Sequence, residues 1–240
     1  MQKAVIITGV SGDIGGAIAK AFDEDGYVVV GTYFNSDSAV ERLADELNND
    51  SFFYKYDLRD SSFAENFVKE LESLDLTYEV LINNAGASLF EELRGLTIDK
   101  WNDLWNLNVT STLFLSKAIT PLFLKGGKGH IINISSVWGE CGASMEVAYS
   151  TTKGAINAFT KAYAKEMAPS HIQVNAISPG FIDTKMNARI PDDVKSTIIE
   201  EIPADRLGTP KDVADATLAL TKAGEYITGQ VINVDGGWQV

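Results

Sequence analysis

The chain has 240 residues, of which 45% are hydrophobic and 22% charged, a balance typical of a soluble globular protein with a sizeable core. Its net charge of −13 argues against nucleic acids and anionic membrane surfaces as binding partners, because both are polyanions. Cys141 is the only cysteine, which excludes an internal disulfide. No uninterrupted apolar run approaches the length that spans a bilayer and no secretory signal is evident, so we expect a cytoplasmic protein.

Short runs rich in β-branched residues alternate with longer amphipathic stretches along the whole chain. The predicted strands cover residues 4–9, 27–33, 51–57, 79–86, 130–136, 172–180 and 229–237. The predicted helices cover residues 14–25, 38–48, 61–73, 98–124, 148–168, 192–201 and 210–222. Apolar strands in strict alternation with helices indicate a parallel sheet covered on both faces. We therefore predict one α/β domain over residues 1–240, a doubly wound parallel sheet of about seven strands with helices on both faces.

The segment 181–209 is the irregular part of this pattern. It follows the end of a predicted strand and carries two acidic pairs, Asp192-Asp193 and Glu200-Glu201. Such pairs are usually the solvated face of a helix. Because of its position we nevertheless expect this segment to be a lid over a substrate site.

The first predicted strand ends in a glycine-rich turn, "TGVSGDIGGAIA" from Thr8 to Ala19. Gly9, Gly12 and Gly15 allow the backbone to approach a ligand closely, and the free amide groups of the following helix favour an anion. A turn of this kind after the first strand of a β-α series indicates a dinucleotide pyrophosphate site. The alternative is that the glycines serve only tight turning and close helix packing.

Tyr149 and Lys153 lie four residues apart in a predicted helix and therefore share one face of it. An ammonium group near a phenol favours the phenolate form and lowers its pKa. Alone, the pair is also compatible with an ordinary half-exposed helix.

Further motifs follow in a fixed order. They are "NNAG" at 83–86, "LNVTS" around Asn108, "NISS" at 133–136, "YSTTK" at 149–153, "PGFIDT" at 179–184 and "ITGQVINVDGG" near the C-terminus. With the glycine turn, they make the whole chain resemble the short-chain dehydrogenase/reductase family. Within it, "PADRLGTPKDVADA" and "YITGQ" are most similar to the 3-oxoacyl-(acyl-carrier-protein) reductases. The resemblance implies a single-domain Rossmann-like fold, a nicotinamide cofactor and carbonyl–alcohol chemistry.

The resemblance also implies a catalytic set. Tyr149 would act as the general acid in reduction, Lys153 would lower its pKa and hold the cofactor ribose, and Ser136 would donate a hydrogen bond to the substrate oxygen. Ser135 is a competing choice, and the family spacing back from the tyrosine favours Ser136. Asn108 would hold a water next to the lysine, unless it is a structural amide.

The residues that would contact the cofactor are implied in the same way. They are Gly9, Ser11, Gly12, Asp13, Ile14, Gly15, Phe34, Asn35, Ser36, Asp57, Leu58, Asn83, Ala85, Gly86, Tyr149, Lys153, Pro179, Gly180, Ile182 and Thr184. Asp13 departs from the family, which has glycine at its position. An aspartate can begin a helix, but its carboxylate would repel a pyrophosphate unless it points away.

The end of the second predicted strand bears on the choice of cofactor. Members of the family that use NAD carry an acid there, and this chain has Tyr33. Asn35 and Ser36 could donate hydrogen bonds to a 2′-phosphate. We therefore predict NADP(H) rather than NAD(H), although no arginine lies in this stretch.

The leading functional hypothesis is an NAD(P)H-dependent carbonyl reductase, a 3-oxoacyl-(acyl-carrier-protein) reductase of fatty acid synthesis. An acyl thioester, with acyl carrier protein as a partner, would then be the substrate, although few basic residues are available to bind that acidic partner. One alternative is a dehydrogenase of the same family for another alcohol, sugar or steroid-like substrate, and another is a nucleotide sensor without turnover. The resemblance implies a homotetramer, and the spacing of His, Cys and acidic residues predicts no metal site.

Overall fold

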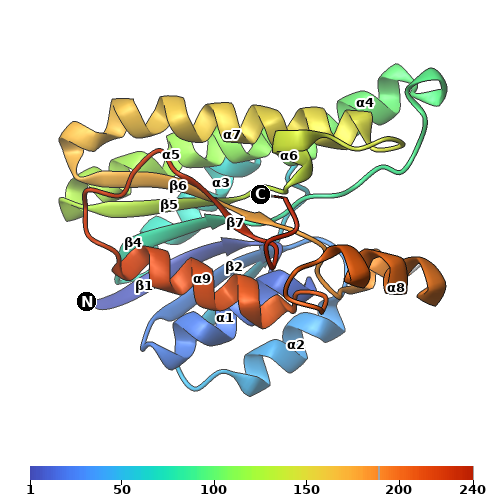
Figure 1. Cartoon of the computed structure of the whole chain (residues 1–240). Coiled ribbons are helices and arrows are strands. Elements are labelled where there is room, and N and C mark those ends of the chain that lie inside the picture. The colour runs from blue at the N-terminus through green and yellow to red at the C-terminus, as the bar shows by residue number, and fades with distance from the viewer. Residues whose placement is uncertain (189, 240) are drawn as a thin grey trace.

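The centre of the molecule is a parallel β-sheet (Figure 1). The computed structural model describes residues 1–188 and 190–239. The strands are β1 (Gln2–Thr8), β2 (Val28–Tyr33), β3 (Ser51–Lys55), β4 (Leu76–Asn83), β5 (Gly129–Ile134), β6 (Ile172–Pro179) and β7 (Val231–Val234). Within the described residues the sheet has seven strands in the order β3-β2-β1-β4-β5-β6-β7, and every neighbouring pair is parallel. The predicted doubly wound sheet is confirmed.

Helices cover both faces of the sheet (Figure 1). One face carries α1 (Asp13–Glu24), α2 (Asp37–Glu46) and α9 (Pro210–Lys222), and the other carries α3 (Phe63–Glu72), α5 (Ser111–Gly126) and α7 (Val147–Met167). The remaining helices are α4 (Ile98–Trp105), α6 (Trp138–Cys141) and α8 (Asp192–Glu201). Three 3₁₀ turns cover Leu93–Gly95, Ala168–Ser170 and Lys185–Asn187. Sequence periodicity predicted every long helix but missed α6 and the 3₁₀ turns, which are too short to show a period.

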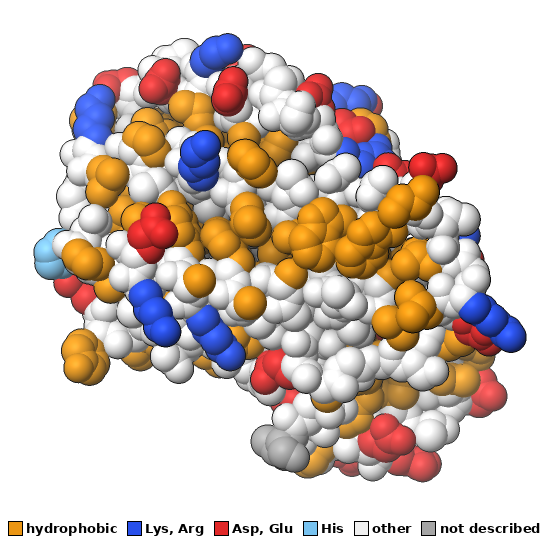
Figure 2. All heavy atoms as spheres, turned by 90° about the horizontal axis from the view of Figure 1, so that it is seen from above, with side chains coloured by type: hydrophobic (Ala, Val, Ile, Leu, Met, Phe, Trp, Pro, Cys, Tyr) orange, Lys and Arg blue, Asp and Glu red, His pale blue; other side chains and the backbone are white. Residues whose placement is uncertain are grey.

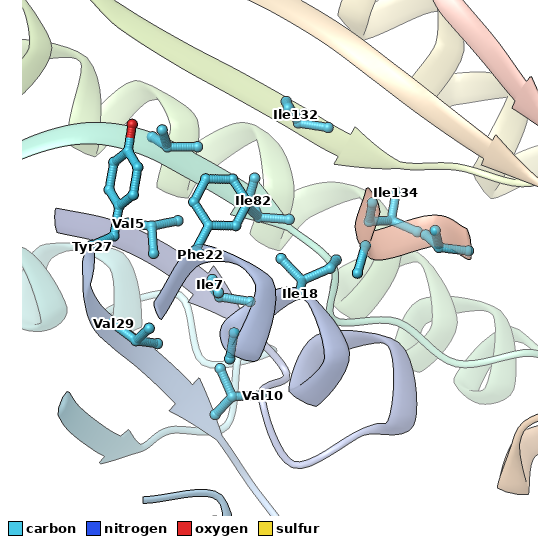
Figure 3. Packing of buried hydrophobic residues seen from close by; sticks show 14 of the residues in the cluster. Val5, Ile7, Val10, Ile18, Phe22, Tyr27, Val29, Ile82, Ile132 and Ile134 are labelled. Atoms are coloured by element: carbon cyan, nitrogen blue, oxygen red, sulfur yellow. The ribbon is translucent and has the colours of Figure 1, made fainter. Parts of the chain in front are cut away.

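The core consists of two apolar layers, one on each side of the sheet. Successive residues of β1 point to opposite faces. Val5 and Ile7 pack with Phe22 of α1 (Figure 3), whereas Ala4 and Ile6 pack with aromatic residues of α3 and α5. Each fully buried side chain of this size contributes about 1.5–3 kcal/mol to folding. The apolar character of both faces explains why the strands read as continuous hydrophobic runs.

The strand order reverses between β1 and β4, which run side by side although they are distant in sequence. In open parallel sheets this switch point is where ligands bind, just beyond the carboxyl ends of the strands. The glycine turn follows β1 there, and the 83–86 motif ends β4. The fold therefore brings these two motifs together.

The stretch Ile98–Gly126 is the one helical region among the described residues that is long and apolar enough to cross a bilayer by length and composition. Half of its most apolar window is buried inside the protein. A core helix that packs on a sheet has the same property, so this is weak evidence for a membrane span.

Candidate active site

The backbone of the turn after β1 allows an anion to bind close to it. Gly9 has a φ of +72°, in the left-handed region that favours glycine, and its amide donates to Thr32 O at 2.8 Å. At Gly15 a Cβ atom would lie 2.2 Å from Gly9 O, so only glycine allows the turn to close on α1. No side chain caps the start of α1, and its first amide groups can bind an anion. The turn therefore fits a pyrophosphate.

The carboxylate of Asp13 is turned towards the predicted lid. It accepts a hydrogen bond of 2.7 Å from the backbone amide of Lys185, and the Lys185 ammonium lies 3.6 Å from its other oxygen. These partners partly offset the negative charge that the departure from the family's glycine introduces. The backbone hydrogen bond also connects the glycine turn to the segment after β6.

The asparagine pair at the end of β4 has two different roles. The Nδ2 of Asn84 donates to Thr8 O at 2.9 Å and to Gly9 O at 3.2 Å, which fixes the glycine turn against β4. The Nδ2 of Asn83 donates instead to Ser116 and Asn133, in a buried network. Asn84 was not predicted as a site residue, although the doubled asparagine was visible in the sequence, and the Asn83 amide serves the core.

The turns after β2 and β3 meet at the expected adenosine end. The Arg59 guanidinium donates two hydrogen bonds to Asp57, at 2.8 and 2.7 Å, and its central carbon lies 5.5 Å from the centre of the Phe34 ring. The Arg59 hydrogen bonds hold the pKa of the Asp57 carboxyl below its usual value. The sequence analysis missed Arg59, because nothing local indicates that it reaches the turn after β2.

The end of β2 places an acid near Tyr33 in space. Asp37 accepts hydrogen bonds from Lys55 at 2.9 and 3.0 Å, and it adds to burial in raising the pKa of the neighbouring Tyr33 hydroxyl. The Lys55 hydrogen bonds are the main cause of the lowered pKa of Asp37. This carboxylate is thus already paired with Lys55.

A pocket of about 280 Å³ lies between α1 and α2, next to Ser11 and Gly12 of the glycine turn. Its lining includes three cationic side chains, Lys20, Arg42 and Lys185. Lys20 forms an ion pair with Glu46 across the pocket. The lining also contains Asp13 and Glu46, which pair with Lys185 and Lys20, so Arg42 is the lining cation that can meet an anionic group.

The other predicted cofactor residues also lie near the carboxyl edge of the sheet. Ile14 packs against the core, Leu58 is buried, and a side chain on Gly9 would touch Ala85. The chain after β6 begins at Gly180, whose amide donates to Val234 O at 3.0 Å. The predicted cofactor residues near this edge are Gly9, Ser11, Gly12, Asp13, Ile14, Gly15, Phe34, Asn35, Ser36, Asp57, Leu58, Asn83, Ala85, Gly86, Pro179, Gly180, Ile182 and Thr184.

The segment 181–209 leaves the sheet and returns to nearly the same place. Ile182 pairs with Gly208 in a parallel bridge, and the Asp183 amide donates to Gly208 O at 2.8 Å. Between these points the segment carries α8, which stands out from the body of the molecule (Figure 1). The two ends of the segment are hydrogen-bonded to each other and α8 projects from them, which is compatible with a lid. The lid stays a prediction.

Tyr149, Lys153 and Ser136 come together at the start of α7. The Lys153 ammonium lies 5.6 Å from the centre of the Tyr149 ring and donates to Ile134 O at 2.8 Å. The Ser136 side chain is near enough to Tyr149 to act on the pKa of its hydroxyl, whereas Ser135 donates to Asn157 at 2.6 Å. Of the two serines, Ser136 is therefore the one placed next to the tyrosine.

Burial controls the protonation of this group. It raises the pKa of the Tyr149 hydroxyl to about 12, although the neighbouring Ser136 side chain acts in the opposite direction. It also lowers the pKa of the Lys153 ammonium to about 8. The expected lowering of the tyrosine pKa by the lysine is therefore not found in the protein alone, since desolvation dominates. A high pKa keeps Tyr149 protonated, the state that a proton donor needs.

Asn108 lies in a π-helical turn, Asn106–Thr110, that interrupts the predicted helix 98–124 between α4 and α5. Its Oδ1 accepts from the Ala87 amide at 2.9 Å, and its Nδ2 donates to Ala87 O and to Thr152 at 2.9 and 3.0 Å. A Cβ on Gly86 would lie 3.1 Å from Asn108 Oδ1 and 3.6 Å from Lys153 Nζ. Asn108 thus ties the end of β4 to α7 beside the lysine, and such π turns are frequent at functional sites.

Among residues 1–188 and 190–239, no group of three or more His, Cys, Asp or Glu side chains is arranged to hold a metal ion. His130 is largely enclosed, and desolvation lowers its pKa. The described residues therefore offer neither a metal site nor a reactive histidine in addition to the groups named above.

Comparisons with known proteins agree with this arrangement. A family model described as enoyl-(acyl carrier protein) reductase matches residues 9–239. The chain is 36% identical to the uncharacterized oxidoreductase YmfI of Bacillus subtilis, covering 99% of both chains, and 33% identical to the 3-oxoacyl-(acyl-carrier-protein) reductase FabG of Vibrio harveyi, covering 98% and 96%. A candidate NAD(P)-dependent gluconate 5-dehydrogenase from Beutenbergia cavernae, solved with NADP, superimposes with a TM-score of 0.91 at 31% identity, covering 98% and 96%.

Proposed function

The chain belongs to the short-chain dehydrogenase/reductase family, and from this premise we propose that it reduces a ketone to a secondary alcohol with NADPH, using Tyr149 as the proton donor. That it is an oxidoreductase of CH–OH groups with a nicotinamide cofactor follows from the family. The observation that supports the proposed roles is the meeting of Ser136, Tyr149 and Lys153 at the carboxyl edge of the sheet.

The residues fit a nicotinamide dinucleotide. The glycine turn presents free amide groups to a pyrophosphate, and Lys153 lies where it would hold the ribose hydroxyls. When bound, the cofactor supplies the hydride that reduces the carbonyl carbon. Ser136 donates a hydrogen bond to the oxygen as negative charge grows there, and Tyr149 transfers its proton to that oxygen. The resulting phenolate is stabilised by the Lys153 ammonium.

NADPH is the favoured cofactor because the acids at the adenosine end are already paired, Asp57 with Arg59 and Asp37 with Lys55, whereas Arg42 forms no ion pair among the described residues. Arg59 lies over Phe34, and Arg42 lines the pocket beside Gly12. Arg42 could therefore approach a 2′-phosphate from the pocket, although the glycine turn itself carries no basic side chain at Gly12.

Two substrate classes are suggested by the relatives. The names of the curated relatives favour a 3-oxoacyl thioester, and the gluconate 5-dehydrogenase title favours a hydroxylated acid. Binding of acyl carrier protein has weaker support, because Lys128 lies 3.2 Å from Glu79 and His171 lies 3.4 Å from Glu225. A nucleotide sensor without turnover has no need of a proton donor, so the presence of Tyr149 favours the reductase over the sensor.

The test is a spectrophotometric screen of the purified protein with NADPH or NADH against 3-oxoacyl thioesters, oxidised sugar acids and simple methyl ketones. We expect cofactor oxidation with at least one class and equimolar formation of the secondary alcohol. Tight cofactor binding without turnover of any ketone, or of any alcohol in the reverse direction, would favour the sensor.

A further inference from the structure

Thr152 is a fully buried residue of α7 that the mechanism above does not use. It follows Tyr149 by three residues and directly precedes Lys153. Its hydroxyl donates to Tyr149 O at 2.7 Å and accepts from Asn108 Nδ2 at 3.0 Å. A threonine hydroxyl has one proton and two lone pairs. Thr152 therefore uses its proton inside α7 and a lone pair to bind the π-helical turn.

The Asn108 side chain depends on this bond for its orientation. Its Nδ2 carries two hydrogens, of which one binds Ala87 O at 2.9 Å and the other binds Thr152. Its Oδ1 accepts from the Ala87 amide at 2.9 Å. Asn108 is buried as well, so loss of the Thr152 hydroxyl would leave one N–H without its acceptor. The amide is therefore fixed by Thr152 together with the backbone of Ala87.

These hydrogen bonds join α7 to the end of β4, where the cofactor is expected. Ala87 follows β4, and Asn108 lies between it and Thr152. The packing is close at this point, because a Cβ on Gly86 would lie 3.1 Å from Asn108 Oδ1 and 3.6 Å from Lys153 Nζ. A shift of α7 relative to Asn108 would therefore also displace the Lys153 ammonium from the end of β4.

A second buried threonine of α7 has the same kind of bonding at a different place. The Thr160 hydroxyl donates to Ile156 O at 2.8 Å and accepts from Asn133 Nδ2 at 2.9 Å. Thr160 is also fully buried. It follows Thr152 by eight residues, which is about 12 Å along a helix. Thr160 therefore shows what such a bond contributes to folding when it is not next to the proton donor.

We propose that Thr152 is a positioning residue for proton transfer, because its hydroxyl bridges Asn108 to the main chain of Tyr149. This inference rests on the proposed ketone reductase function and adds a residue to it. The bridge holds the first turns of α7 in place, and with them the Tyr149 hydroxyl and the Lys153 ammonium. A small displacement of a proton donor slows the reaction more than it weakens binding. Thr152 should therefore act on turnover and not on affinity.

The test replaces each threonine by valine, which has the same shape but no hydroxyl. The single-turnover rate of NADPH oxidation is measured with a ketone that the wild type reduces, so that product release does not hide the effect. Thr152→Val should lower this rate about tenfold, while KM for the ketone and Kd for NADPH stay within about twofold. Thr160→Val loses an equivalent buried bond and should keep the rate within about twofold of wild type. Thr152→Ser restores a hydroxyl and should recover most of the rate.

A double variant tests whether Thr152 acts through Asn108. In an Asn108→Ala background the partner is absent, so adding Thr152→Val should change the single-turnover rate less than about threefold. A full tenfold effect in that background would overturn the bridge. An equal loss of rate in Thr160→Val would overturn it as well, because the effect would then come from helix stability.

The remaining outcomes separate this inference from the proposed function. An unchanged rate in Thr152→Val, or no recovery in Thr152→Ser, would overturn the inference but leave the reductase function intact. If Thr152→Val does not fold, Thr152→Ala is assayed in the same way and with the same expected loss. Absence of turnover by the wild type with every ketone would overturn the proposed function, and this inference with it.

Discussion

The carboxylate of Asp13, at the start of α1, accepts a hydrogen bond of 2.7 Å from the backbone amide of Lys185, 172 residues later in the chain. The contact joins the glycine turn to the first residue of the 3₁₀ turn in the predicted lid. It therefore lies between the expected pyrophosphate site and the segment that would cover the substrate. We expect the charge of Asp13 to weaken cofactor binding and its hydrogen bond to hold the segment in place.

The variant Asp13→Asn separates these two effects. Asparagine keeps an acceptor for the Lys185 amide and removes the negative charge near the pyrophosphate. We expect the Kd for NADPH, measured by fluorescence titration, to fall by about three- to tenfold, which corresponds to about 1 kcal/mol of removed repulsion. Asp13→Ala, which loses the acceptor as well, is the matched comparison. An unchanged or higher Kd in Asp13→Asn would show that the carboxylate does not act on the cofactor.

The variant Tyr149→Phe removes the proposed proton donor and keeps the ring. Turnover should fall about 10²-fold or more, because general acid catalysis is lost. The Kd for the cofactor should stay within about twofold, since the ring and the Lys153 ammonium beside it are kept. Stopped-flow or steady-state assays with any ketone that the wild type reduces provide the measurement. Turnover comparable to wild type would remove Tyr149 from the mechanism.

The buried Lys153 should lower stability at neutral pH. Burial lowers its pKa from 10.5 to about 8, so the unfolded chain binds more protons than the folded one between these values. The free energy of unfolding contributed by this group therefore rises as pH rises from about 8 to 10.5, and the penalty is fully present below about pH 8. Lys153→Met should be more stable than wild type at pH 7, by up to about 3 kcal/mol, while losing activity.

Urea denaturation of the two proteins at several pH values measures this effect. The stability difference should shrink as pH increases through the same window. A difference that stays constant with pH would mean that it comes from packing rather than from the charge.

Cofactor preference should be modest in the wild type and reversible by one substitution. Tyr33→Asp places a carboxylate at the end of β2, where it accepts from the ribose hydroxyls and repels a 2′-phosphate. The ratio of kcat/KM for NADPH to that for NADH should exceed one in wild type and fall below one in Tyr33→Asp. A wild type that strongly prefers NADH would indicate that Asp37 binds the ribose in spite of its contact with Lys55.

The last prediction concerns the oligomeric state of the protein. A band of hydrophobic side chains crosses the face shown in Figure 2. Exposed apolar residues of α4 and α5 include Ile98, Phe114 and Leu124, which are 68%, 53% and 51% exposed. We expect a homotetramer in sedimentation velocity at micromolar concentration and a shift to smaller species in Phe114→Asp. Tyr226→Asp, at a fully exposed residue outside these helices, is the control. A monomeric wild type would contradict the prediction.

The sequence alone determined the fold, and the resemblance of its motifs indicated an oxidoreductase. The period of the apolar residues depends only on neighbours within a strand or a helix turn, so it predicted the sheet and the long helices. The glycine turn and the Tyr149–Lys153 spacing are local as well. A helix brings residues four apart to one face wherever it lies in the fold.

Other features were decided by the tertiary structure, because they join segments that are far apart in the chain. The Lys185 contact shows where the Asp13 carboxylate points, and the partner of each serine separates Ser136 from Ser135. The pairing of the Trp138 and Trp238 rings depends on how the C-terminal segment returns to α6. Even the sign of the Tyr149 pKa shift came from burial, a property that neighbours in sequence do not reveal. Packing sets these contacts, and packing is known only when the whole chain has folded.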